Sequence, residues 1–389
     1  MLKPLVSFIM PTYKREKMIQ KVLNKLTPIS NQVNGEIIVA DNNINENTAK
    51  MIRLKFPKVR LYCAHENLGV KARNIALKMA KSLYVFMMDD DSCPLPGTIM
   101  PGIKILQKDK TIGCLAYLVD LSAGKKWSNG VYTVFTGCGA LFPKKALEKI
   151  GGYPEDILYY AEEYEVTFRL YGKGYRTVSS KKLSVFHDKP PGNKDFPQRL
   201  FQLLRNNSMI YSKYLPKAWA IKHIEYENWR YKKIAEKEKA MKAYNKGLRE
   251  ALFMAGEYLG SNRYRLSEKV ACKALGLDLF EKRFLKFAKK NKIRQTVILG
   301  VGKFLPEIIN MAKSHGIEIK AVIEKNKFMK GAFIEGVEIK DITQIGGIKF
   351  DCVISGSLSL IVNDEQEKAV SSIKGFKNRP FFRACDYDF

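Results

Sequence analysis

The segment Leu83-Tyr84-Val85-Phe86-Met87-Met88-Asp89-Asp90-Asp91 decides how the first half of this chain folds. Its first six residues are apolar and have the length and composition of a buried strand. Two further strand-like runs precede it, Val6–Met10 and Glu36–Ala40, and helical patterns cover about 18–26 and 70–81. Apolar strands that alternate with helices predict an α/β domain with a parallel, doubly wound sheet.

Polar residues follow each of these three strands. Pro11-Thr12 ends the first, Asp41 ends the second, and Asp89–Asp91 ends the third. Open α/β sheets bind ligands beyond the carboxyl ends of their strands, so we expect these residues to share one site. Three adjacent carboxylates repel one another, and a divalent cation would relieve that repulsion. Hard cations such as Mg²⁺ and Mn²⁺ prefer oxygen ligands, although a solvated acidic turn or a helix N-cap would also explain the triplet.

Six short segments within residues 1–215 extend this pattern. They are Val6–Arg15, Glu36–Asn42, Glu66–Asn74, Asp89–Asp91, Gly151–Tyr153 and Glu162–Arg169. In this order and at this spacing they resemble the family 2 glycosyltransferases, which have the GT-A fold. The resemblance implies a GT-A-type doubly wound mixed sheet. It also implies an inverting transfer of a sugar from a nucleotide-diphosphate sugar to an acceptor hydroxyl.

The same resemblance implies roles for individual residues. The first loop would border the nucleotide, Asp41 would read the base or ribose, and Asp90 would lie at the donor. Asp89 and Asp91 match the outer positions of the family's DXD motif and would hold Mn²⁺ or Mg²⁺ at the diphosphate. The remaining residues implied at the nucleotide-sugar site are Pro11, Thr12, Tyr13, Arg15, Asn67, Lys71 and Arg73.

The catalytic base is the point at which this sequence departs from the family. Glu163 occupies the place of the base, where the family usually has aspartate, and it follows Glu162. The longer side chain keeps the carboxylate but extends its reach by one methylene, so Glu162 stays an alternative base. A solvated helix face formed by Glu162, Glu163 and Glu165 is the plainer explanation.

His187 is the histidine of most interest among the four in the chain. It follows the alternating segment Leu183–Phe186 and precedes Pro190-Pro191-Gly192. Some relatives place a third metal ligand here, and neutral imidazole suits Mn²⁺. A purely structural histidine is the alternative.

The middle of the chain is basic, within a formal net charge of +28. Residues 216–250 hold ten Lys or Arg against five Asp or Glu, interleaved with tryptophan and tyrosine, and 281–294 hold seven against one. Basic helices with such aromatics suit an anionic membrane surface. A solvated helical face is the alternative, and we do not expect nucleic-acid binding because no such module is visible.

The last hundred residues predict a separate small α/β unit. Strand patterns cover Thr296–Leu299, Glu318–Glu324 and Phe350–Ser355, and Gly300-Val301-Gly302 follows the first of them. This resembles the Rossmann-like domains attached to sugar-modifying enzymes, but Leu305 replaces the third glycine of the dinucleotide fingerprint. An NAD-dependent oxidoreductase is one reading, and a packing domain that lost its ligand is the other.

These patterns together predict three parts. Residues 1–215 would form the catalytic domain, 216–291 a basic helical segment that contacts acceptor or membrane, and 292–389 the Rossmann-like domain. The acceptor would be a cell-envelope glycan or a lipid-linked molecule, and a non-catalytic nucleotide-sugar-binding protein is the alternative. The chain has no run of 18 apolar residues and no cysteine framework, so we expect a cytoplasmic protein, peripheral on the inner membrane face. The sequence does not fix the donor or the oligomeric state.

Overall fold

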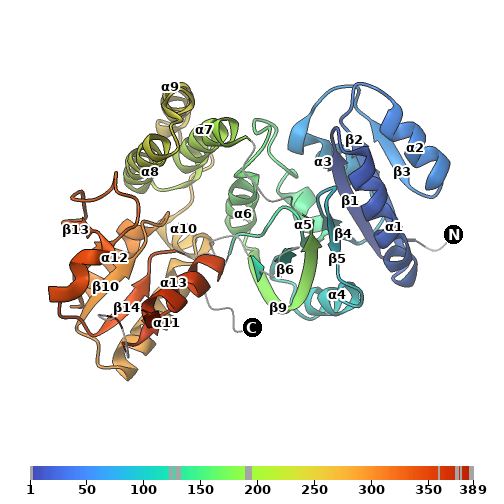
Figure 1. Ribbon diagram of the computed structural model, residues 1–389. Coiled ribbons are helices and arrows are strands. Elements are labelled where there is room, and N and C mark those ends of the chain that lie inside the picture. The colour runs from blue at the N-terminus through green and yellow to red at the C-terminus, as the bar shows by residue number, and fades with distance from the viewer. Residues whose placement is uncertain are drawn as a thin grey trace. The chain divides into compact units, whose positions relative to one another are not determined.

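The computed structural model describes residues 3–121, 126–127, 133–188, 195–357, 360–372, 376 and 379–384. The described residues fall into two compact units, which divide between residues 188 and 195 (Figure 1). The Pro190-Pro191-Gly192 loop singled out above lies outside the described residues.

The N-terminal unit is built on one mixed sheet with the strand order β3-β2-β1-β4-β8-β6-β9-β5. β1, β2, β3 and β4 run parallel, whereas β8 is antiparallel to both β4 and β6. The predicted α/β class is therefore confirmed, and the sheet is mixed, as the GT-A resemblance implied. Its strands are β1 Val6–Thr12, β2 Gly35–Asp41, β3 Arg60–Cys63, β4 Tyr84–Met87, β5 Ser92–Pro94, β6 Ile112–Leu121, β7 Lys126–Trp127, β8 Ala140–Pro143 and β9 Arg176–His187.

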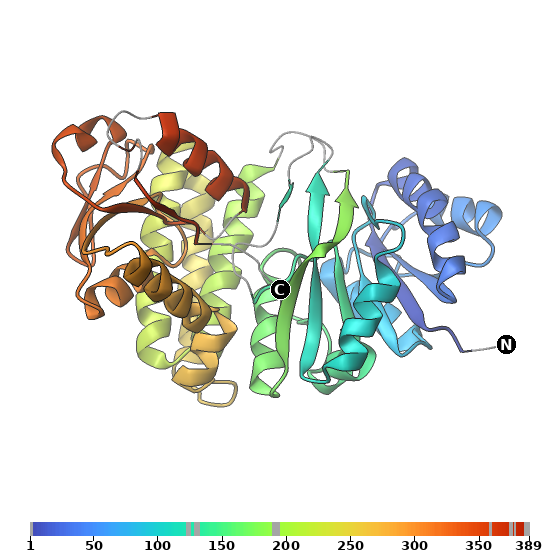
Figure 2. The same ribbon diagram turned by 90° about the horizontal axis from the view of Figure 1, so that it is seen from below.

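Helices cover both faces of this sheet, so its central strands are buried on both sides (Figure 2). Phe8 and Phe86 pack with α1 and α4 on one face, whereas Ile9 packs with α3, α5 and α6 on the other. Burial of one such side chain contributes about 1.5–3 kcal/mol. The helices are α1 Glu16–Gln32, α2 Asn47–Lys55, α3 Ala72–Met79, α4 Ile99–Lys108, α5 Lys144–Lys149 and α6 Glu162–Gly172, with a 3₁₀ turn at Gly69–Lys71.

The second unit begins with a group of helices. α7 packs along α8 and α9, and α10 packs on α11. Tyr231 of α8, Leu204 of α7 and Tyr244 of α9 share one apolar cluster. The helices are α7 Phe196–Tyr214, α8 Lys217–Lys237, α9 Met241–Leu259, α10 Glu268–Ala274 and α11 Leu277–Lys290. None of the helices in the described part of the chain is both long and apolar enough to cross a bilayer.

The second unit ends in a six-stranded sheet with the order β12-β13-β11-β10-β14-β15. All its pairs are parallel except that of β12 with β13, and the parallel strands follow the 3-2-1-4-5 order of a doubly wound fold. Its elements are β10 Gln295–Leu299, α12 Leu305–Ser314, β11 Glu318–Ile323, β12 Phe333–Ile334, β13 Val337–Lys340, a 3₁₀ helix Ile342–Gly347, β14 Cys352–Ser355, α13 Leu360–Ser372 and β15 Phe381–Phe382.

The glycine-rich loop after β10 is held by the unit's own chain. Glu324 accepts a hydrogen bond from the Val301 amide at 2.9 Å, and the Tyr226 hydroxyl donates to the Gly302 carbonyl at 2.6 Å. A Cβ atom on Gly302 would overlap the carbonyl oxygen of Gly356. The Val301 amide, which a fingerprint of this kind could offer to a pyrophosphate, is thus bonded to a side chain of the same unit.

The helical segment and the last sheet share one core. Tyr226 of α8 and Phe284 of α11 pack in the same cluster as Ile298 and Leu305. By packing, α7 belongs to this unit as well, because it contacts α9 and α8. The structure groups the helices α7–α11 with the last sheet in one compact unit. The sequence predicted three parts, with boundaries at 215 and 291, and this division stays a prediction about functional modules.

The loop before α6 yields a stability prediction. Gly152 has a φ of +76°, and a Cβ there would overlap Asn74 Oδ1, which accepts a hydrogen bond from the Tyr153 amide at 2.7 Å. Gly152→Ala should therefore lower the free energy of unfolding by at least about 2 kcal/mol more than Gly174→Ala. Gly174 is the matched control because it has a φ of +80° and open space around its Cβ position. Urea unfolding curves measure both variants, and equal losses would contradict this packing.

Candidate active site

The acidic triplet lies where β1 and β4 end side by side. Asp90 and Asp91 are buried, and Asp89 is partly exposed. The Thr12 hydroxyl at the end of β1 donates to Asp90 Oδ2 at 2.7 Å. The triplet is therefore not a solvated turn, because two of its carboxylates are held inside the domain.

Two arginines compensate the charge of these carboxylates. Arg15, at the start of α1, lies 2.5 Å from Asp91 Oδ2 and 3.2 Å from Asp90 Oδ1. Arg73 of α3 is buried and lies 2.5 Å from Asp89 Oδ1, and it also donates to the Met88 carbonyl at 3.1 Å. Both arginines had been expected at the nucleotide-sugar site. Together the two arginines form ion pairs with all three aspartates.

Asp90 and Asp91 have shifted pKa values, and the shifts have opposite directions. Burial raises the pKa of Asp90 to about 6, although Thr12 and Arg15 favour its ionised form. Burial also opposes ionisation of Asp91, but hydrogen bonds from His187 and Arg15 hold its pKa below the usual value. Asp91 is therefore an anion at neutral pH. Asp90 is more easily protonated and is held by hydrogen bonds from Thr12 and Arg15.

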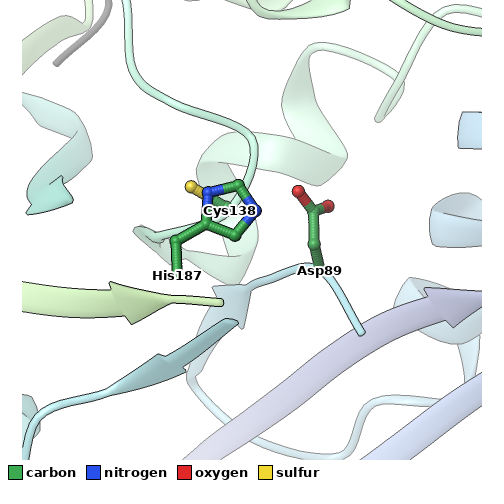
Figure 3. Close-up of side chains that lie close together, drawn as sticks. All are labelled: Asp89, Cys138 and His187. Atoms are coloured by element: carbon green, nitrogen blue, oxygen red, sulfur yellow. The ribbon is translucent and has the colours of Figure 1, made fainter. Parts of the chain in front are cut away.

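His187, the last residue of β9, faces the triplet. Its Nε2 lies 2.9 Å from Asp91 Oδ1. Burial lowers the pKa of His187, but Asp91 and Cys138 outweigh it and raise that pKa to about 10. One ligand atom each from Asp89, Cys138 and His187 lies within 4.8 Å of the others (Figure 3).

The donor set is suited to a divalent cation. Carboxylate oxygens from Asp89 and Asp91 with an imidazole nitrogen from His187 match the preferences of Mn²⁺, and the oxygens alone match those of Mg²⁺. His187 links the two aspartates, because one of its ring nitrogens lies within 4.8 Å of an Asp89 oxygen and its Nε2 lies 2.9 Å from Asp91 Oδ1. The three residues expected to hold the metal are therefore brought together at one place.

Glu162 and Glu163 form the first turn of α6. The Gly137 amide donates to Glu163 Oε1 at 3.2 Å, and a Cβ on Gly137 would also approach Glu162 Oε1. Glu163 is partly exposed, whereas Glu162 is 7% exposed and its Oε2 has no hydrogen-bond partner among the described residues. These residues are therefore not a solvated helix face.

The backbone before α6 is strained. Tyr160 and Ala161 both have left-handed φ angles, +69° and +70°, which cost L-residues about 1–2 kcal/mol each. Such strain persists where the surroundings over-determine it, and it is concentrated at functional sites. The turn aims the first residues of α6 at Gly137, one residue before Cys138 of the metal-ligand cluster.

The two glutamates share a low-dielectric environment. Burial, followed by repulsion from Glu163, raises the pKa of Glu162 to about 8. Burial likewise raises the pKa of Glu163, and the Gly137 amide and Arg73 partly offset this. The pair therefore resists carrying two negative charges at neutral pH.

The other residues expected to bind the nucleotide lie at the ends of β1 and β2 and at the start of α3. Buried Asp41 accepts hydrogen bonds from the Asn43 amide at 3.0 Å and from its side chain at 2.6 Å. Asn67 Oδ1 accepts from the Tyr159 hydroxyl at 2.8 Å. Pro11, Tyr13 and Lys71 are all partly exposed. Their roles in binding stay predictions.

The sequence reasoning missed Cys138, Gly137 and Tyr159. Each lies on a loop, and none belongs to a motif with a readable spacing. The Gly-Cys-Gly at 137–139 before the short strand β8 was the only available signal. It becomes informative only when the fold brings it against His187 and α6.

Two glycosyltransferases are among the solved structures that match this chain. A mannosyltransferase, PcManGT from Pyrobaculum calidifontis in complex with GDP-Man and Mn²⁺, is 20% identical with a TM-score of 0.44, covering 74% of this chain and 84% of that one. TarS 1-349 of S. aureus in complex with UDP-GlcNAc is 18% identical with a TM-score of 0.44, covering 53% and 66%.

Two curated relatives are polysaccharide synthases. The chondroitin synthase of Escherichia coli is 24% identical over 254 residues, which are 50% of this chain and 36% of that protein. The hyaluronan synthase of Pasteurella multocida is 28% identical over 117 residues, 29% of this chain and 12% of that protein. The chain therefore spans about a third or less of the length of these relatives.

The family model of Glycosyl transferase family 2 matches residues 7–151. This range contains β1, the acidic triplet, both arginines and Cys138, and it ends before α6 and His187. Together with the mixed sheet, this match identifies residues 7–151 as a glycosyltransferase family 2 segment within a GT-A-type sheet.

Proposed function

We propose that this protein is an inverting, metal-dependent glycosyltransferase that moves a sugar from a nucleotide-diphosphate sugar to a hydroxyl of a glycan. The observation that carries the proposal is the meeting of two groups at residues 137 and 138. Gly137 contacts Glu163, and Cys138 lies beside Asp89 and His187. One loop, at residues 137 and 138, therefore contacts both a carboxylate of raised pKa and the proposed metal ligands.

Glu163 is the group that we assign as catalytic base. It would take the proton of the acceptor hydroxyl while that oxygen forms a bond to the anomeric carbon. The bond from this carbon to the diphosphate breaks on the opposite face, so the configuration inverts. Glu163 suits this role better than Glu162 because it is partly exposed and is oriented by an amide. A raised pKa brings a carboxylate closer to the operating pH of a general base.

The leaving diphosphate requires positive charge. Asp89, Asp91 and His187 would hold Mn²⁺ or Mg²⁺, which neutralises charge on the diphosphate. Arg15 and Arg73 already lie against the aspartates and would be close to the donor phosphates. One base and one cationic site are sufficient for the reaction, because the cation takes the place of a general acid.

The relatives suggest a glycan as acceptor. Both are named as synthases of sugar polymers, chondroitin and hyaluronan. The match covers only a part of each, so the polymer itself does not transfer to this chain. We infer a growing glycan or a lipid-linked glycan as the acceptor class.

Two alternatives carry less support. A protein that only binds a nucleotide sugar does not require a strained turn that presents two carboxylates beside metal ligands, whereas a catalytic site does. NAD-dependent chemistry in the second unit is disfavoured because Glu324 and Tyr226 already bond the glycine-rich loop, and Gly356 packs against Gly302.

The assignment of the base is tested by exchanging each glutamate for its isosteric amide. Glu163→Gln should lower the transfer rate about 10²- to 10⁴-fold, because it removes proton transfer alone. Its affinity for the donor, measured by calorimetry with Mn²⁺, should stay within about threefold of wild type, as expected of an interaction that acts in the transition state. Glu162→Gln is the matched control and should lose less. A larger loss in Glu162→Gln would reverse the two assignments.

The pH profile gives a second test of the pair. The base must be ionised, and burial raises its pKa, so the rate should rise with pH above the range in which an ordinary glutamate titrates. Burial and repulsion from Glu163 raise the pKa of Glu162 to about 8, so Glu162 keeps its proton while Glu163 ionises. Glu162→Gln should therefore leave the position of this rise unchanged. Single-turnover rates measured across pH test this, and a rise that moves to lower pH would show that Glu162 is charged when the base titrates.

Attachment to an anionic membrane is a further part of the proposal. α9 exposes Leu252 and Phe253, which are 58% and 66% accessible. Exposed Lys242, Lys246 and Arg249 lie on the same side of that helix by its 3.6-residue period. Apolar residues flanked by basic ones are typical of a helix that lies in a membrane interface.

Vesicle binding tests this surface. The double variant Leu252→Glu/Phe253→Glu should bind vesicles of 30% phosphatidylglycerol at least about tenfold more weakly, because it replaces two exposed apolar side chains by carboxylates, which an anionic surface repels. Leu54→Glu in α2 is the matched control, since Leu54 is 81% exposed on the other unit. Equal binding by both variants, or equal binding of wild type to uncharged vesicles, would contradict membrane docking through α9.

A further inference from the structure

The loop before β8 is fixed against the sheet, and with it the amide of Gly137. The Gly139 carbonyl accepts a hydrogen bond from the Tyr117 amide of β6 at 3.0 Å. A Cβ atom on Gly139 would lie only 2.4 Å from Val185 of β9, so the loop is in tight contact with this strand as well. The Gly137 amide therefore has a fixed position from which it donates to Glu163 Oε1 at 3.2 Å.

The backbone that carries Glu163 is held on the other side of this contact. The Leu158 carbonyl accepts from the Val70 amide at 3.0 Å, which ties the segment before α6 to the 3₁₀ turn at 69–71. The left-handed residues Tyr160 and Ala161 then lead directly into α6. Because donor and backbone are both fixed, the length of the side chain at position 163 decides whether its carboxylate reaches the amide.

The space between them fits a glutamate that faces a glycine. A Cβ atom on residue 137 would lie 3.1 Å from Glu163 Oε1, which is tighter than most contacts of a Cβ atom. The hydrogen bond of 3.2 Å is already at the long end of the range for N–H donors, so a carboxylate that moved away would lose it. Gly137 is not among the glycines with a positive φ, so an alanine there would adopt the same backbone without strain. What this glycine contributes is its missing side chain.

We propose that Gly137 is a positioning residue that adapts the site to a glutamate as catalytic base. Its amide holds the carboxylate of Glu163, and the absence of a Cβ atom leaves room for that carboxylate. The proposal rests on the function proposed above, in which Glu163 takes the proton of the acceptor hydroxyl. Gly137 acts through Glu163, because proton transfer requires the base to lie within hydrogen-bond distance of the proton that it takes.

Gly137→Ala tests the proposal directly. The variant should lower kcat at least about fivefold, because the added Cβ atom displaces the carboxylate from the amide and a small misplacement of a reacting group is costly. Its affinity for the donor, measured by calorimetry with Mn²⁺, should stay within about twofold of wild type. An unchanged kcat, or a loss of donor affinity as large as the loss of kcat, would overturn the proposal.

A double-mutant cycle separates positioning from general loosening of the loop. Glu163→Asp keeps a carboxylate but withdraws it by one methylene, so in this background the Cβ atom added by Gly137→Ala has nothing to displace. Gly137→Ala should then lower the single-turnover rate by less than about twofold. A loss as large as in the wild-type background would show that Gly137 does not act through Glu163.

Gly139→Ala is the matched control for this cycle. It adds a Cβ atom to the same loop, but this atom meets Val185 and not Glu163. Its effect on the rate should therefore be the same factor in the wild-type and Glu163→Asp backgrounds. Dependence of this factor on residue 163 as strong as that of Gly137→Ala would overturn the specific role of Gly137.

The outcomes also distinguish this proposal from the function on which it rests. Full activity in Glu163→Gln would overturn the assignment of the base together with the role of Gly137. A large loss in Glu163→Gln without any loss in Gly137→Ala would overturn only the role of Gly137.

Discussion

The contact on which this domain depends is that between three consecutive carboxylates and the two arginines that hold them. Asp89, Asp90 and Asp91 could not share the end of β4 without compensation, because two of them are buried. Arg15 approaches from α1 and Arg73 from α3, so helices on both faces of the sheet contribute to one site. Loss of Arg15 would remove the arginine beside buried Asp90 and one of the two cationic partners of buried Asp91.

The same arrangement links stability to reactivity. Arg15 and His187 keep Asp91 ionised, which a metal ligand requires, whereas burial raises the pKa values of both glutamates at the start of α6. One short loop before β8 contacts both groups through Gly137 and Cys138. The left-handed turn at Tyr160 and Ala161 costs free energy and directs α6 toward that loop. The pKa of one carboxylate is lowered and that of a neighbouring one is raised, and this is typical of sites that combine ion binding with proton transfer.

Local patterns predicted the elements that carry periodic apolar residues. β1, β2, β4, β10, β11 and β14 were predicted because each is a continuous apolar run of strand length. The short strands β12, β13 and β15 of the second unit were not predicted. The antiparallel strands β6 and β8 were not predicted, since the parallel pattern gave no sign that the chain reverses after α4. The three residues that the motifs assigned to the metal, Asp89, Asp91 and His187, lie close together in the structure. Cys138, Gly137 and Tyr159 were missed because loop geometry, and not spacing, brings them to the site. The burial of Glu162 likewise depends on tertiary packing that no sequence window contains.

The central claim is that the acidic turn and His187 hold one cation together with the diphosphate of an activated sugar. Electron–nuclear double resonance on protein loaded with Mn²⁺ and a nucleoside diphosphate tests it most directly, because hyperfine couplings report the atoms bound to the ion. The account predicts a nitrogen coupling that disappears in His187→Ala and a phosphorus coupling that disappears in Asp91→Asn. A spectrum that shows only water protons around the ion would contradict it.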